Sequence, residues 1–204
     1  MKGLLLKDFY TLLRQAKIFL MLIVLFSLLP NMQMSAFAVV YASMLPITAL
    51  AYDERAKWDS LAAMMPYSER DIVLSKYLLG YILIAGSAVI ASLCQTVIGM
   101  VKREPATSEQ LISILLVACV ATILLAVNLP FMFKMGVERG RVVFFILVAV
   151  TTFAGMTLGS YFLDALTSAR INPALAAIVF IALTVVVNAA SIAISARVYK
   201  NKTA

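Results

Sequence analysis

The chain has 204 residues and no histidine, and Asp, Glu, Lys and Arg together make up only 13% of it. The lack of histidine removes the commonest general base and the commonest metal ligand. The sequence also lacks Gly-x-Ser-x-Gly, Cys-x-x-Cys and any cluster with metal-ligand spacing. A phosphate-binding loop of the form Gly-x-x-x-x-Gly-Lys-Ser/Thr is missing too. We therefore expect no catalytic residue, no metal and no cofactor bound by this chain.

Apolar residues are abundant instead. They form 63% of the sequence, and the mean hydropathy is +0.99, whereas soluble domains are about half apolar and about a quarter charged. A helix that crosses a membrane needs about 20 mostly apolar residues. We interpret the whole chain, 1–204, as one polytopic membrane domain. The uncharged runs behind this interpretation are 18–52, 77–101, 110–133, 142–163 and 171–196.

The first uncharged run, 18–52, is too long for one membrane crossing. As a single helix it would be roughly 52 Å long, against a hydrocarbon core of about 30 Å. Its polar interruption PNMQMS, at 30–35, is a natural place for a turn. The sequence therefore predicts an all-α polytopic fold with six transmembrane helices, at about 16–31, 35–52, 77–101, 110–132, 142–163 and 173–196.

The net charge of +7 has an uneven distribution along the chain. If the N-terminus is cytoplasmic, every basic residue except Lys102, Arg103 and Arg170 falls on a cytoplasmic segment. Basic residues near membrane spans favour the cytoplasmic side. We therefore expect both termini in the cytoplasm and the protein in the cell membrane. The positive charge is then a signal of orientation in the lipid bilayer, and we expect no nucleic-acid partner.

The N-terminal segment 1–17 has a helical pattern of its own. Apolar residues recur with helical spacing, while polar residues lie largely off that face. We expect a helix in the membrane interface, with a simple extension of the first span as the alternative. The apolar positions are Leu5, Phe9, Leu12, Leu13 and Ala16, and the polar ones are Lys2, Asp8, Thr11 and Gln15.

Charge is concentrated in 52–77, which lies between two uncharged runs and contains the only tryptophan, Trp58. In this segment Trp58, Leu61, Ala62 and Met65 have the spacing of one helical face, and Pro66 ends it. An amphipathic helix of this kind can rest on lipid headgroups or dock in a groove of a cytoplasmic partner. The residues alone leave these two interpretations even.

Two segments carry a resemblance to a known family. The sequences DERAKWDSLAAMMPYSERDIVLSKY (53–77) and LPFMFKMGVERGR (129–141), together with six expected spans, resemble the small membrane permeases of ABC-2-type transporters. The resemblance covers essentially the whole chain. Within that group the chain is similar to exporters of phenol-soluble modulins, which are short amphipathic peptides.

The resemblance implies a coupling helix at 53–67 that contacts a separate cytoplasmic ATP-binding subunit, where ATP and Mg would be bound. It also implies a smaller second contact after the fourth span and a working unit with a second permease, either another copy or a sister subunit. Export of peptides or toxins is the implied function; the alternatives are a secondary transporter without an ATPase and a non-transporting scaffold. The implied coupling residues are Asp53, Glu54, Arg55, Lys57, Trp58, Leu61 and Met65, and the second contact is Lys134, Glu138 and Arg139.

A few polar or small residues lie within the expected spans. Gln95, Asn128 and Asn188 are candidates for the translocation path, although such side chains more often form hydrogen bonds between helices. Gly155 and Gly159 form a GxxxG pattern, which permits close helix packing within the bundle or between two copies. No charged residue lies near the middle of any expected span, which argues against an ion-coupled transporter.

Overall fold

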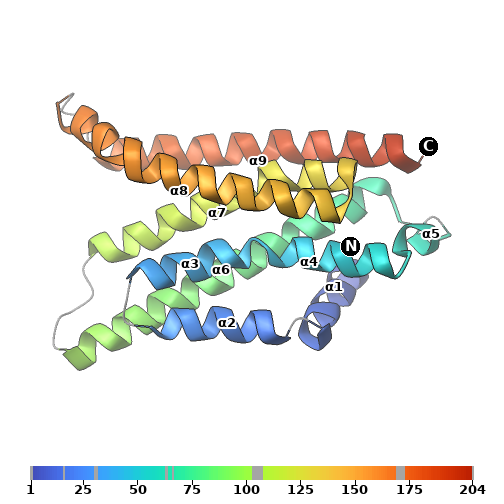
Figure 1. Ribbon diagram of the computed structural model, residues 1–204, viewed down its shortest axis with the longest axis horizontal. Coiled ribbons are helices and arrows are strands. Elements are labelled where there is room, and N and C mark those ends of the chain that lie inside the picture. The colour runs from blue at the N-terminus through green and yellow to red at the C-terminus, as the bar shows by residue number, and fades with distance from the viewer. Residues whose placement is uncertain are drawn as a thin grey trace.

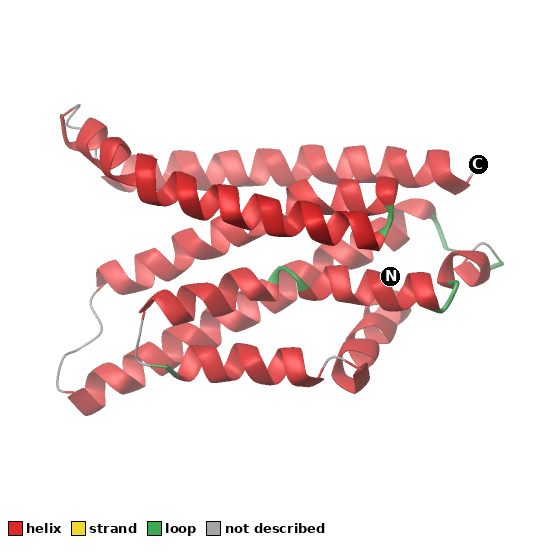
Figure 2. Ribbon diagram, in the orientation of Figure 1, coloured by secondary structure: helices red, strands yellow, loops and turns green. Residues whose placement is uncertain are grey.

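A computed structural model describes residues 2–15, 17–29, 32–62, 64–65, 67–102, 108–168 and 173–203. Within these residues all regular secondary structure is helical, and no strand is present (Figure 2). The prediction of an all-α protein is therefore confirmed for the described part of the chain. The helices are α1 (Lys2–Gln15), α2 (Lys17–Leu28), α3 (Met32–Ala42), α4 (Leu45–Arg55), α5 (Trp58–Ala62), α6 (Glu69–Lys102), α7 (Ser108–Met135), α8 (Val137–Ser168) and α9 (Pro173–Thr203).

The long helices run along one common direction, as Figure 1 shows. At one end of the bundle the short α1 crosses the others, α5 projects outward, and the chain turns from α7 into α8. Both chain termini are found toward this end, which we call the α5 end. That this end and both termini face the cytoplasm stays a prediction.

Four helical segments among the described residues are long and apolar enough to cross a membrane. They correspond to the predicted spans at 35–52, 77–101, 110–132 and 173–196. The pair α1 and α2 could form one more, broken, span, and their axes are bent by 79°. The predicted spans 16–31 and 142–163 are not among the four, so six spans stay a prediction. The four segments are Met34–Arg55, Glu69–Val101, Ile112–Met135 and Ile178–Asn201.

The span Met34–Arg55 consists of α3 and α4, which are separated by a short turn. Pro46 lies in the first turn of α4, and a proline has no backbone N–H to continue the helix ladder. Just before it, the N–H groups of Ser43 and Met44 bond to the carbonyls of Val40 and Tyr41, three residues back, at 3.1 and 3.0 Å. The two helices therefore keep one direction, but the backbone between them makes a tighter turn, with hydrogen bonds to the third residue back instead of the fourth.

A second proline, Pro130, lies inside α7. It cannot donate to the carbonyl of Ala126, four residues earlier. The hydroxyl of Ser191 on α9 donates to that carbonyl instead. The hydroxyl of Tyr77 on α6 then pairs with the hydroxyls of Ser191, at 2.6 Å, and Ser195, at 2.8 Å. In lipid, backbone groups must be satisfied inside the protein, so this group of hydrogen bonds connects α6, α7 and α9 where the α7 ladder is interrupted.

We predict that Ser191→Ala lowers the stability of the protein by about 1 kcal/mol, because it leaves the Ala126 carbonyl without a donor. Unfolding in detergent can be followed by the reactivity of the thiols of Cys94 and Cys119, which are both partly buried and free. Ser87→Ala is the matched control. Ser87 is 3% exposed, but its hydroxyl bonds only to Ile84 of its own helix. Equal midpoints for the two variants would contradict the role given to Ser191.

Candidate functional site

Four charged side chains meet at the α5 end of the bundle. The ammonium group of Lys76 on α6 lies 2.7 Å from a carboxylate oxygen of Asp8 on α1 and 2.5 Å from one of Asp53 on α4. The ammonium group of Lys7 on α1 lies 3.0 Å from Asp8 and 2.7 Å from Asp53. We call Lys7, Asp8, Asp53 and Lys76 the junction cluster. Each of its charges has two partners of the opposite sign, and the cluster as a whole is neutral.

Asp8 and Lys76 form the buried part of the junction cluster, because α1 presents an inward face that contains a charge, while Lys7 and Asp53 are partly exposed. Leu4, Asp8 and Leu12 follow each other at intervals of four residues and are 3%, 1% and 1% exposed. Lys76 is 3% exposed. Removing such groups from water is costly, and only close pairing of opposite charges offsets that cost. The cluster therefore fixes where α1, α4 and α6 lie relative to each other.

The structure adds a protein-facing side to α1 that the sequence pattern did not predict. Phe9 and Leu13 of the predicted apolar face are 39% and 40% exposed, so they remain available to the membrane interface. Asp8, which the pattern places off the apolar face, is buried because Lys76 and Lys7 neutralise its carboxylate. The exposed side of α1 is itself apolar, with Leu6, Phe9, Tyr10 and Leu13 along one helical face. An exposed stripe of this kind is typical of a helix that lies in the membrane interface.

The segment expected to be one coupling helix, 53–67, is divided in two. Asp53, Glu54 and Arg55 form the end of α4, and the short α5 starts only at Trp58. Between them Lys57 has a φ of +52°, a left-handed conformation that ends a helix. Positions 63 and 66 lie outside the described residues.

The predicted coupling residues face in two directions. Asp53 belongs to the junction cluster. Trp58 is partly buried against the core, and the ammonium group of Lys7 lies 3.9 Å from the centre of its ring. Glu54 accepts a hydrogen bond of 3.1 Å from the backbone N–H of Val137, at the start of α8. These three residues therefore connect the segment to the bundle, and the side chains that face outward are Arg55, Lys57, Leu61 and Met65.

The second predicted contact lies beside the first. Gly136, between α7 and α8, has a φ of +82°, which glycine adopts without strain. A small cavity of about 30 Å³ lies between this turn and the loop, with Glu54, Trp58, Gly136 and Val137 in its lining. The predicted residues of this turn, Lys134, Glu138 and Arg139, are all exposed. The structure thus places the outward residues of both predicted contacts at the same end of the bundle.

One comparison with known proteins identifies a family for this chain. The family model described as ABC-2 family transporter protein matches residues 3–200. The chain belongs to this family. No curated protein and no solved structure matches the chain. ABC-2 proteins are the membrane components of transporters and are not themselves catalytic, and they generally work with an ATP-binding subunit. This chain is accordingly a multi-pass membrane protein of a transporter.

The polar residues within the spans have different surroundings. The side-chain N–H of Gln95 donates to the hydroxyl of Ser35 at 2.7 Å, connecting α6 to α3. The side-chain oxygen of Asn188 accepts from the hydroxyl of Tyr81 at 2.8 Å, connecting α9 to α6. Asn128 differs from both, because it is fully buried and its amide has no hydrogen-bond partner among the described residues. Gln95 and Asn188 therefore act in helix packing, while Asn128 keeps its place as a candidate polar group for a path.

Gly155, the described member of the glycine pattern in α8, faces away from the rest of the described bundle. A Cβ atom placed on it would meet no atom of the described chain within 4 Å. The surroundings of Gly159 lie outside the described residues. Gly155 therefore makes no close helix contact with the described residues, and its face is open to lipid or to a second chain.

Three members of the junction cluster, Lys7, Asp8 and Lys76, are absent from the residues that sequence reasoning selected. One signal was present: Asp8 shares the four-residue spacing of Leu4 and Leu12, so a buried face would have to include it. Nothing in the sequence shows which cation neutralises it, since Lys76 comes from a segment far along the chain.

We predict that Lys76→Met destabilises the protein by about 3–5 kcal/mol, because it leaves two carboxylates facing one ammonium group in a buried place. Thermal unfolding in detergent measures the effect. The double variant Asp8→Asn with Lys76→Met should recover part of the loss, since Lys7 and Asp53 remain as a neutral pair. Arg70→Met, on an exposed residue of the same helix, is the control and should change stability by less than about 0.5 kcal/mol. A variant of Lys76 as stable as the Arg70 variant would show that the junction cluster does not hold these helices together.

Proposed function

We propose that this chain is the permease of an ATP-driven exporter and that the loop between α4 and α6 couples it to a cytoplasmic ATP-binding subunit. The observation that carries the proposal is the division of the loop into an inner and an outer side. Asp53, Glu54 and Trp58 contact α1, α6 and the start of α8. The outer side offers exposed apolar and basic side chains to a partner: Leu61, Met64 and Met65, which are 49%, 84% and 39% exposed, together with Arg55 and Lys57.

The inner contacts give a route for motion. A partner that moves the loop displaces Asp53 and Glu54 at the end of α4 directly. Through the junction cluster the same displacement reaches α6 and α1, and through Glu54 it reaches the turn before α8. The helices that respond include those of two candidate spans, Met34–Arg55 and Glu69–Val101. Coupling of this kind is a difference in binding energy between two states, so the loop must favour one nucleotide state of the partner.

The proposal includes an orientation and an assembly. The α5 end faces the cytoplasm of the cell, with both termini, because the basic residues gather there. The turn with Lys134, Glu138 and Arg139 provides the second, smaller contact. The open face of α8 around Gly155 supports a second permease, a copy or a sister subunit, packed against this helix. ATP and Mg belong to the partner, and the permease supplies the path.

The substrate class that we propose is amphipathic peptides such as phenol-soluble modulins, on the resemblance of the chain to permeases that export them. We assign Asn128 to the translocation path, because its buried side-chain amide forms no hydrogen bond with any described residue. A secondary transporter without an ATPase and a scaffold without transport activity remain the competing functions, and the experiment below separates them.

The test changes only the outer side of the loop. The triple variant Leu61→Ser, Met64→Ser, Met65→Ser should lose at least tenfold in export and in copurification of a coexpressed ATP-binding subunit, because it removes the apolar surface that the partner would cover. The amount of protein in the membrane should not change, since these side chains are exposed.

A control variant carries the same kind of change at the other end of α6. Met100 and Val101 are 72% and 80% exposed, and their replacement by serine should leave copurification intact. If the loop variant transported peptides normally in an ATP-dependent manner, the assigned coupling surface would be wrong. Transport by the unchanged protein in vesicles without any ATPase would favour the secondary transporter, and loss of partner localisation without any flux would favour the scaffold.

A further inference from the structure

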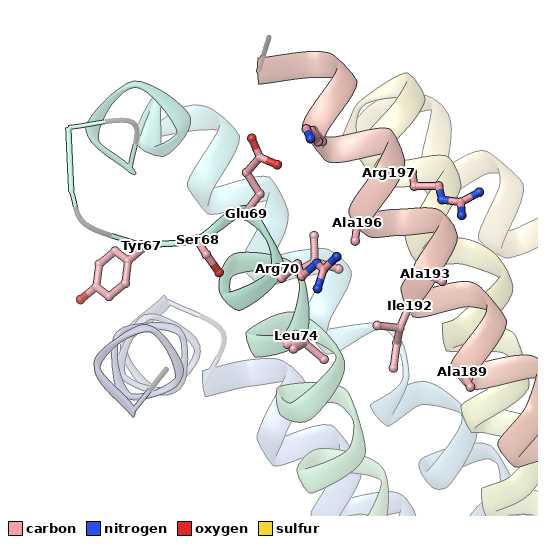
Figure 3. A pocket seen from close by; sticks show the side chains of 12 residues that line it. Tyr67, Ser68, Glu69, Arg70, Leu74, Ala189, Ile192, Ala193, Ala196 and Arg197 are labelled. Carbon is pink, nitrogen blue, oxygen red and sulfur yellow. The ribbon is translucent and has the colours of Figure 1, made fainter.

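A groove of about 800 Å³ opens between the start of α6 and the last turns of α9 (Figure 3). On the α6 side it is lined by Arg70, Val73 and Leu74, together with the residues just before them. On the α9 side Ala189 and Ala193 form part of the wall. These small side chains leave the space open, and they lie on a flank of the contact at which Tyr77 bonds to α9.

The groove is charged at the α5 end of the bundle and apolar further along the helices. Arg70 and Arg197 lie in the charged part. Neither forms an ion pair with a residue that the structure describes. Figure 3 shows the side chain of Arg70 extending from α6 toward α9, while Arg197 lies nearer the C-terminal end of α9 and its exposed side chain extends away from α6. Both residues line the groove. Glu69 and Lys200 line the groove as well, so its charge is net positive. Deeper along the helices the lining is Val73, Leu74, Ala189, Ile192 and Ala193.

This division matches the layers of a membrane. Arg70 lies at the start of the candidate span Glu69–Val101, and Arg197 lies near the end of the candidate span Ile178–Asn201. Both arginines are therefore expected at the level of the headgroups, at the edge of the hydrocarbon core. Eight residues separate Arg197 from Ala189, which is about 12 Å along a helix. A ligand that fits the whole groove therefore carries a negative charge at one end and an apolar chain of at least about this length at the other.

We propose that the groove between α6 and α9 binds one anionic phospholipid, with its phosphate at Arg70 and Arg197 and the upper part of an acyl chain along Val73, Ile192 and Ala193. Arginine is well suited to phosphate because it donates several N–H groups in a planar fork. Anionic lipids are a regular component of the cytoplasmic leaflet, where the proposed orientation puts this groove. Binding in detergent does not depend on the proposed coupling or transport, so the two proposals can fail separately.

Native mass spectrometry of the purified full chain tests the proposal. The probes are dioleoyl phosphatidylglycerol and dioleoyl phosphatidylcholine, which have the same chains and differ in headgroup charge. We expect a preference of about tenfold for phosphatidylglycerol in the first bound lipid, at roughly fivefold or less for each arginine. The variant Arg70→Gln with Arg197→Gln should reduce this preference to nearly none. Both residues are exposed, so the variant should fold normally.

Two further variants locate the effect. Arg55→Gln with Arg139→Gln removes the same charge from exposed positions at the same end of the bundle, outside the groove, and should keep the preference. Ala193→Phe retains every charge but fills the apolar wall, and it should reduce the binding of both lipids several-fold. Millimolar inorganic phosphate should displace neither lipid, because the acyl chain contributes to binding.

Three results would overturn the proposal. One is a preference for phosphatidylglycerol that survives the loss of Arg70 and Arg197. Another is an equal loss of preference in the Arg55 and Arg139 control, which would indicate a general effect of surface charge. The third is displacement of the lipid by inorganic phosphate, which would make the groove a site for a free anion.

Discussion

A buried lysine and a buried aspartate must remain paired in an apolar protein, and the architecture at the α5 end depends on this constraint for Lys76 and Asp8. Asp8 is almost fully shielded from solvent, and its carboxylate lies close to Lys76 and Lys7. A displacement of α1, α4 or α6 alone would separate opposite charges in a place without water to replace them. The three helices are therefore expected to move together, because moving one of them alone would be electrostatically unfavourable. Because Asp53 ends α4, the loop that follows is attached to this group.

The polar contacts deeper in the bundle serve a different purpose. Pro130 interrupts the ladder of α7, and Ser191, Tyr77 and Ser195 provide hydrogen bonds across three helices at that point. Gln95 and Asn188 make further contacts between helices. Together these bonds fix the packing of α3, α6, α7 and α9, whose apolar faces give little directional preference within lipid. The fully buried Asn128 is the exception, since no described residue bonds to its amide.

Much of the fold follows from the sequence, because a membrane crossing requires a long uncharged run. The runs 77–101 and 110–133 predicted the cores of α6 and α7. The structure extends α6 back to Glu69, where the Ser68 hydroxyl accepts a hydrogen bond from the N–H of Asp71 and caps the helix. The broken geometry around Lys57 was not predictable from apolar spacing, since a positive φ has no periodic signature. The junction cluster was missed because its partners are distant along the chain: Lys7 and Asp53 are 46 positions apart.

We infer that the junction cluster couples the loop to the bundle, and a distance measurement tests this most directly. Spin labels at the exposed positions Met64 and Asn201, in a background with Cys94 and Cys119 replaced by alanine, report the distance between the loop and the end of α9 by pulsed electron paramagnetic resonance. In lipid nanodiscs we predict a single narrow distribution, broadened or split by Lys76→Met. The control Arg14→Met, on an exposed residue of α1, should leave it unchanged. A distribution that stays narrow without Lys76 would show that the loop is held by other contacts and would contradict the claim.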